Sequence, residues 1–165
     1  GILFNHESPL RGEEFVTRKI IINLVKILNN DINFFELGNI YAKRDWGYAK
    51  EYVEAMWKIL QRKKPSDYVI ATGKTYSIKY FINLATKYLK MNVKWVGKGL
   101  NEKLINKDNN KTIIKINPKF FRPSEVNILI GDCSKAKNEL KWKPKVNLNE
   151  LVKIMIDEEI EYYKK

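Results

Sequence analysis

The sequence is poor in cysteine, histidine and arginine, and each scarcity narrows the possible chemistry. Cys133 is the only cysteine and His6 the only histidine. No internal disulfide can form, and no metal site is expected, because zinc needs several Cys or His ligands. No apolar run approaches the ~20 residues of a membrane span and no signal peptide opens the chain. We therefore expect a soluble, cytoplasmic protein.

Positive charge is abundant but evenly spread. The formal net charge of +12 over 165 residues makes nucleic acid or a membrane surface the first candidate partner. The densest basic run is only Arg62-Lys63-Lys64, however, and no RNA-binding aromatic motif or zinc-finger spacing occurs. We therefore expect neither nucleic acid nor a membrane as partner, and a basic nucleic-acid binder ranks last among the possible functions.

Arginine accounts for only five of the 31 basic residues. In a chain that uses lysine so freely, arginine indicates positions where a planar fork of donors is needed. Three arginines lie in or beside loops with Gly or Pro: Arg11 in SPLRG, Arg44 in KRDWG and Arg122 in FRPSE. Three such forks predict a bound polyanion, such as a diphosphate.

Strand and helix patterns alternate along the chain, which predicts one compact α/β unit spanning residues 1–165. We expect strands at 1–4, 33–37, 67–71, 93–96 and 111–117, and helices at 13–28, 49–60, 78–89, 134–140 and 148–162. Because the strand at 111–117 alternates and ends at Pro118, we expect it at a sheet edge. The polar stretch 97–110 is expected to be a mobile loop.

The stretch 37–60 joins a turn, a charged pair and a long amphipathic helix. The apolar residues predicted for its buried face are Ala49, Tyr52, Val53, Met56, Trp57 and Leu60; those predicted for its solvent face are Lys50, Glu51, Glu54 and Lys58. Two interpretations of the residues before it stay open. Asp45 caps the helix and Arg44 only pairs with it, or Arg44 binds an anion at the helix amino terminus.

The first residues form an apolar strand that opens into the polar run Asn5-His6-Glu7-Ser8-Pro9. Ligands of open α/β sheets bind at the carboxyl ends of strands, which is where Asn5 and His6 fall. A buried strand with no hairpin partner before it suggests that the chain is the later part of a larger protein.

Six segments carry a resemblance to a known family. They are LFNHESP, FVTRKI, the stretch from Lys43 to Met56, DYVIATG, FRPSEV, and the run from Lys135 to Pro144. In this order they resemble the carboxy-terminal half of GDP-mannose 4,6-dehydratase, a family of extended short-chain dehydrogenase/reductases. The resemblance implies an α/β fold made of the last strands and helices of an NAD(P)-binding Rossmann fold plus a small α/β substrate-binding domain. It also implies that the amino-terminal dinucleotide-binding half is absent.

The resemblance implies a lyase that uses NADP to convert GDP-mannose into GDP-4-keto-6-deoxymannose and water, a step towards GDP-fucose and related deoxysugars. It further implies a homo-oligomer for the full-length enzyme. Members of the family use a Tyr-x-x-x-Lys pair and a glycine-rich dinucleotide turn. Here no tyrosine is followed by lysine four residues on, and no Gly-x-Gly-x-x-Gly occurs. We therefore expect no catalytic residue in this chain, which would be inactive alone.

Residue by residue, the resemblance implies that His6 and Arg11 help to hold NADP. The implied substrate contacts are Asn5 at the phosphates or sugar, Val16 and Lys19 at guanine, Gly38 and Arg44 at the nucleotide and its diphosphate, Arg122 as a second diphosphate fork, and Glu125 at a ribose hydroxyl. For the charged residues the alternative is a surface ion pair. For the whole chain the alternative is a nucleotide-sugar binding or interaction module without catalysis.

Overall fold

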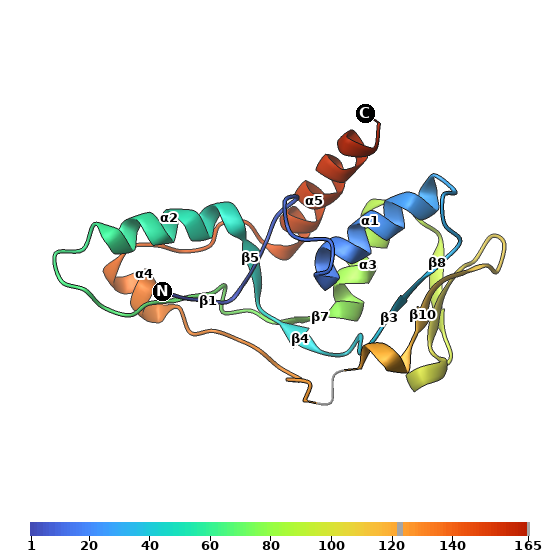
Figure 1. Ribbon diagram of the computed structural model, residues 1–165, viewed down its shortest axis with the longest axis horizontal. Helices are drawn as coiled ribbons and strands as arrows, with labels where there is room; N and C mark the ends of the chain where they lie inside the picture. The colour runs from blue at the N-terminus through green and yellow to red at the C-terminus, as the bar shows by residue number, and fades with distance from the viewer. Residues whose placement is uncertain (122–123, 165) are drawn as a thin grey trace.

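The computed structural model describes residues 1–121 and 124–164. Figure 1 shows an elongated molecule in which two groups of elements lie side by side. One group holds α1 (Val16–Leu28), α3 (Ile78–Tyr88) and α5 (Leu148–Tyr163). The other holds α2 (Ala49–Leu60) and α4 (Ser134–Glu139). The predicted α/β class and the helices are confirmed, apart from small shifts at their ends.

A four-stranded sheet accompanies the first group of helices. Its order is β3 (Phe35–Leu37), β10 (Thr112–Ile116), β9 (Lys103–Asn106) and β8 (Val93–Val96), with β3 parallel to β10 and the other pairs antiparallel. The prediction of an edge strand at 111–117 is wrong, because β10 lies between β3 and β9. The predicted mobile loop at 97–110 is also wrong, since it contains η1 (Gly99–Asn101) and β9, whose Leu104 and Ile105 are buried.

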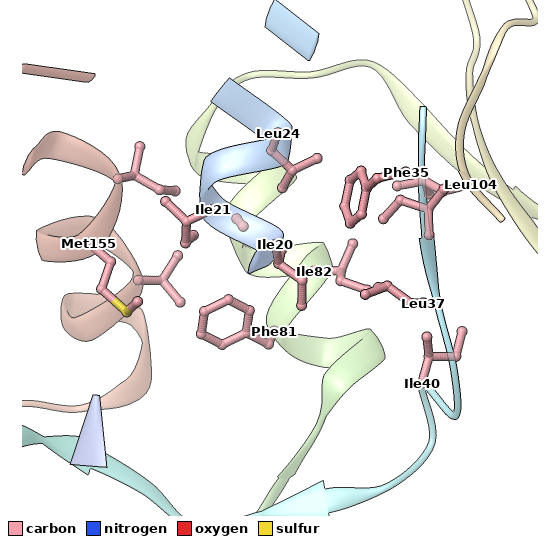
Figure 2. Packing of buried hydrophobic residues seen from close by; sticks show 14 of the residues in the cluster. Ile20, Ile21, Leu24, Phe35, Leu37, Ile40, Phe81, Ile82, Leu104 and Met155 are labelled. Atoms are coloured by element: carbon pink, nitrogen blue, oxygen red, sulfur yellow. The ribbon is translucent and has the colours of Figure 1, made fainter. Parts of the chain in front are cut away.

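The larger hydrophobic cluster lies between this sheet and the three helices (Figure 2). Helix α1 contributes Ile20, Ile21 and Leu24, and α3 contributes Phe81 and Ile82. The inward face predicted for α5 is confirmed: Leu148, Leu151, Val152, Met155 and Ile156 are all buried. A buried ion pair between Arg18 and Glu159 fastens α1 to α5.

Local capping explains where two of these helices begin. The Ser77 hydroxyl accepts a hydrogen bond from the Tyr80 N–H at 3.1 Å, as the sequence predicts for α3. At α5, Asn147 and Glu150 form a reciprocal capping box. Helix α1 differs: it begins at Val16, so Glu13 and Glu14 lie in a turn before it and not in its first turn as expected.

The smaller cluster packs α2 and α4 against two parallel strands, β1 (Ile2–Leu3) and β6 (Val69–Ile70). The Trp142 indole N–H donates to the Glu51 carbonyl at 2.9 Å. The Glu51 carboxylate accepts from the Lys145 N–H at 2.8 Å and from the Val146 N–H at 3.2 Å. Glu51 is therefore buried, and its predicted place on the solvent face of α2 is wrong because the chain at 145–146 needs an acceptor.

The predicted buried face of α2 is largely wrong, because only one of its six residues is buried and four are exposed. Tyr52 is fully buried. Val53, Met56, Trp57 and Leu60 are instead 60%, 39%, 62% and 80% exposed. Hydrophobic spacing marks the apolar residues of a helix, but the neighbours present decide which of them are covered. The first strand differs too, since Ile2 is 57% exposed rather than buried.

Two short strand pairs lie between the clusters. Strand β2 (Asn5–Glu7) runs parallel to β5 (Trp46–Tyr48), and β4 (Lys43–Arg44) runs antiparallel to β7 (Tyr76–Ser77). The turn η2 (Pro118–Phe120) follows β10. Among the described residues, no helix combines the length and the apolarity needed to cross a membrane.

Candidate functional site

A cavity of about 600 Å³ opens where β2, β4, the start of α1 and η2 meet. Six of the nine site residues predicted from the sequence line it: Asn5, Val16, Lys19, Gly38, Arg44 and Glu125. The pairing of β2 with β5 sets Asn5 opposite Trp46 at one wall. Segments as far apart as residues 5 and 125 are therefore gathered at one place, and their binding roles stay predictions.

Arg44 is held by the segment that follows η2. Its guanidinium forms an ion pair with Glu125 and donates to the Val126 carbonyl at 2.6 Å. A further bond reaches the Lys43 carbonyl at 2.8 Å. The predicted pairing of Arg44 with Asp45 is wrong, because Arg44 pairs with Glu125 whereas Asp45, between β4 and β5, accepts from Thr72. Two residues expected to touch the same ligand thus contact each other.

Asp45 is fully buried and does not cap α2, which begins after Tyr48 without a side-chain cap. Its carboxylate accepts from the Thr72 N–H at 2.8 Å, the Thr72 hydroxyl at 2.6 Å, the Gly73 N–H at 3.0 Å and the Gly131 N–H at 3.2 Å. The sequence-based expectation of a cap is therefore wrong. Asp45 instead joins the loop after β6 and the segment before α4 to the wall of the cavity.

Lys19 and Gly38 shape the side of the cavity next to η2. The Lys19 ammonium donates to the Glu36 carbonyl at 2.9 Å and lies 4.4 Å from the centre of the Phe120 ring. Burial lowers the pKa of Lys19, and the Glu36 charge opposes that shift. A Cβ on residue 38 would approach the Phe120 carbonyl oxygen to 2.4 Å. Only glycine at 38 therefore lets η2 close against β3.

His6 and Arg11, the predicted cofactor residues, lie beside the cavity and not on its lining. The His6 Nδ1 donates to the Phe4 carbonyl at 2.9 Å. The Arg11 guanidinium carbon lies 3.6 Å from the centre of the Phe15 ring. Its buried Nε has no hydrogen-bond partner in the described part of the chain. That Nε lies 3.6 Å from a Glu7 carboxylate oxygen, in an ion pair that is too long for a hydrogen bond.

Sequence reasoning missed Glu7 and Thr17, which also line the cavity. Glu7 is 1% exposed, accepts from the Thr17 hydroxyl at 2.5 Å and lies 3.6 Å from the Arg11 Nε. Burial raises the pKa of Glu7, while the Thr17 hydrogen bond and the Arg11 charge lower it in part. For Glu7 the sequence did contain a signal. Glu7 follows Asn5 by two residues, so its side chain lies on the same face of β2.

Two further predictions concern Arg122 and metals. Arg122 lies outside the described residues, so its predicted contact with a diphosphate stays a prediction. Residues 1–121 and 124–164 contain no group of three or more His, Cys, Asp or Glu side chains arranged to hold a metal ion.

Solved structures share this fold across almost the whole chain. RMD from Pseudomonas aeruginosa, complexed with NADPH, superposes with a TM-score of 0.77 at 16% identity, covering 97% of this chain and 47% of that one. The dTDP-glucose 4,6-dehydratase from Bacillus anthracis, in complex with NAD, gives 0.69 at 14% identity, covering 99% and 43%. At these identities the likeness shows the fold alone, and it confirms the predicted Rossmann-type α/β architecture.

Sequence relatives are much closer. Residues 1–155 match the family model of GDP-mannose 4,6 dehydratase. The Drosophila melanogaster GDP-mannose 4,6 dehydratase is 53% identical over 165 residues, covering 100% of this chain and 42% of that protein. The Homo sapiens protein of the same name is 48% identical over 161 residues, covering 98% and 43%. The chain thus spans less than half the length of these relatives. The chain belongs to the GDP-mannose 4,6-dehydratase family.

Proposed function

We propose that this chain provides the nucleotide-sugar-binding part of a GDP-mannose 4,6-dehydratase, which converts GDP-mannose into GDP-4-keto-6-deoxymannose and water. One observation carries the proposal: residues that the family resemblance assigns to the substrate line a single cavity of about 600 Å³. A volume of this order suits a ligand larger than a simple sugar. The relatives' names and the family match support the same activity.

Three basic residues line the cavity, Lys19, Arg44 and Lys119, and three acidic residues line it too, Glu7, Glu14 and Glu125. We propose that the basic residues bind the diphosphate, and Asn5 adds an uncharged amide. Arg44 now binds the Glu125 carboxylate, an anion, through its guanidinium. A substrate diphosphate would take over donors of this fork, since guanidinium pairs equally well with carboxylate and phosphate. Glu125 would then be free to accept from a ribose hydroxyl.

The proposed cofactor is NADP, which when bound would accept a hydride from the sugar and return it. His6 and Arg11 would hold it beside the cavity, and the Arg11 guanidinium, which now forms an ion pair with Glu7, would bind a cofactor phosphate. The chain has no Tyr-x-x-x-Lys sequence. We propose that it is inactive alone and works with a dinucleotide-binding half, in a cytoplasmic homo-oligomer on the route to GDP-fucose.

Calorimetric titration of the chain with GDP-mannose tests the binding role. Arg44→Ala should weaken binding by about tenfold or more, because a charge-assisted pair of hydrogen bonds is lost. Arg62→Ala is the matched control, since Arg62 pairs with Glu139 on the far side of α2. Equal affinity in Arg44→Ala and wild type would refute the proposed diphosphate contact.

A non-catalytic binding module is the second candidate. The two functions separate when the chain is mixed with the part of the Drosophila melanogaster relative that it does not match. Formation of a 4-keto sugar from GDP-mannose would support the dehydratase. A correctly assembled complex that binds GDP-mannose without turnover would support the module.

A further inference from the structure

Glu102 is a buried glutamate that does not line the cavity. It follows η1 and precedes β9, and its side chain is 3% exposed. One carboxylate oxygen accepts from the Lys79 ammonium at 2.6 Å, and the other accepts from the Tyr41 hydroxyl at 2.5 Å. Each oxygen of the carboxylate thus has a donor, and we call Tyr41, Lys79 and Glu102 the Glu102 clamp.

The clamp holds a pair of opposite charges beside two aromatic rings. The Lys79 ammonium lies 5.3 Å from the centre of the Tyr41 ring and 4.9 Å from that of the Trp95 ring. The Trp95 indole N–H in turn donates to Asn83 of α3 at 2.8 Å. Burial raises the pKa of Glu102, but the bonds from Lys79 and Tyr41 outweigh it and hold that pKa below its ordinary value. The carboxylate is therefore ionised at neutral pH, beside the lysine cation.

One wall of the cavity adjoins the clamp in the sequence. Ile40 and Ile78 both line the cavity, and they directly precede the clamp residues Tyr41 and Lys79. The Lys79 N–H donates to the Ile40 carbonyl at 2.8 Å. Ile40 is 2% exposed and lies in the larger cluster (Figure 2). This wall is therefore tied to the start of α3 by a backbone bond and to the segment before β9 by the clamp.

From these contacts we infer that Glu102 is a positioning residue for the nucleotide end of the ligand, on which it acts through Tyr41 and Lys79. The inference rests on the proposed function and on the nucleotide contact that the family resemblance implies for Gly38. Residues 38–40 form a continuous stretch of the cavity lining. A displaced Tyr41 would therefore move the surface that the nucleotide meets. A loosened wall lowers affinity, because its segment must be ordered when the ligand binds.

The test compares the affinities of Glu102→Gln and the wild type for GDP and for GDP-mannose by calorimetric titration. The amide leaves the Lys79 cation without its anion, so both affinities should fall by about fivefold. The two losses should be equal, because the wall meets the nucleotide that both ligands share. Glu51→Gln is the matched control. Glu51 is also a buried glutamate, but it holds residues 145–146 by the smaller cluster, so both affinities should stay unchanged.

Substitution of the two partners sharpens the test. Lys79→Met removes the cation and should lower both affinities, whereas Lys79→Arg keeps it and should lower them less. Tyr41→Phe removes only a hydroxyl from a side chain that is 55% exposed, so this variant should fold. Hydrogen exchange of the free chain then reports on the wall without a ligand. The Lys79 N–H should exchange faster in Tyr41→Phe and Glu102→Gln than in the wild type and Glu51→Gln.

The outcomes separate this inference from the proposed function. Equal losses of affinity for GDP and GDP-mannose, together with faster exchange at the Lys79 N–H, support the positioning role. A wild-type chain that binds both ligands, with Glu102→Gln binding them as tightly, would overturn that role alone. Unchanged exchange in both clamp variants, or a loss for GDP-mannose without a loss for GDP, would also overturn it. A wild-type chain that binds neither ligand would refute the proposed function, and the inference with it.

Discussion

The two hydrophobic clusters of this chain differ in how completely they are closed. The larger one is covered on every side by α1, α3, α5 and the four-stranded sheet, and its Ile20, Phe81 and Met155 are fully buried (Figure 2). The smaller one has fewer members and leaves Trp57 and Leu60 exposed on the adjoining side of α2. An apolar residue therefore stabilises the chain only where a second element covers it.

The cavity lies between these clusters, and its walls come from segments that pack in one cluster or at the border of the other. Val16 and Lys19 come from α1, which the larger cluster holds, whereas Arg44 comes from β4, at the junction with the smaller one. We expect the α1 side to be the more rigid wall. The following substitutions test this contrast, from the largest expected effect to the smallest.

Phe81→Ala should have the largest effect, because it opens a hole in the closed cluster. A fully buried phenylalanine that packs against Trp46, with ring centroids 5.5 Å apart, should cost about 3–5 kcal/mol in free energy of unfolding when truncated. Urea denaturation followed by circular dichroism measures it. Exposed Leu100→Ala serves as reference, and a loss as small as the reference would contradict the assignment of Phe81 to the core.

Asp45→Asn should cost less, about 1.5–3 kcal/mol, because it replaces a charged acceptor at the junction of the clusters. An amide would turn a donor towards the Thr72 or Gly73 N–H groups, which now donate to the carboxylate. Urea unfolding gives the cost, and hydrogen exchange should show faster exchange at Gly73. Unaltered exchange there would show that Asp45 does not hold the loop.

Glu7→Gln should have a smaller effect on the free energy of unfolding, and this effect should depend on pH. Burial raises the pKa of Glu7 above the usual 4.5, so the protonated group contributes stability below that pH, which is lost as pH rises through the folded-state pKa. From pH 4.5 to about 7 the wild type should lose more free energy of unfolding than Glu7→Gln. Urea midpoints across this range measure the difference. Exposed Glu13→Gln should follow the wild type, and parallel curves for all three would exclude a raised pKa.

Trp57→Ser should have the smallest effect on the chain alone. Trp57 is 62% exposed, and substitutions at such positions usually change the free energy of unfolding by no more than about 0.5 kcal/mol. Thermal and urea unfolding of the isolated chain give this value. A loss above about 2 kcal/mol would contradict the exposed position of Trp57 on α2.

Local sequence signals were enough to place the helices. Ser77 and the Asn147–Glu150 pair mark the starts of α3 and α5, because caps involve residues close in sequence. The spacing of apolar residues gave the inward face of α5. Lys141, just after α4, has a left-handed backbone conformation with φ at 50°, at a cost of roughly 1 kcal/mol.

These local signals could not predict which distant strands and side chains pair with each other. The central place of β10 depends on β3 and β9, which lie about 75 and 10 residues earlier in the chain. The partner of Arg44 is Glu125, 81 residues away, and not the adjacent Asp45. Asp45, between β4 and β5, instead accepts a hydrogen bond from Thr72, 27 residues away.

The sequence by itself determined the α/β class, the helices, the family and the set of residues worth testing as a binding site. Tertiary contacts were needed to see that six of those residues share one cavity, that Glu7 and Thr17 belong with them, and that Trp57 and Leu60 of α2 are exposed. The physical reason is that propensity, capping and periodicity act over a few residues, whereas burial and ion pairing depend on which distant segments meet.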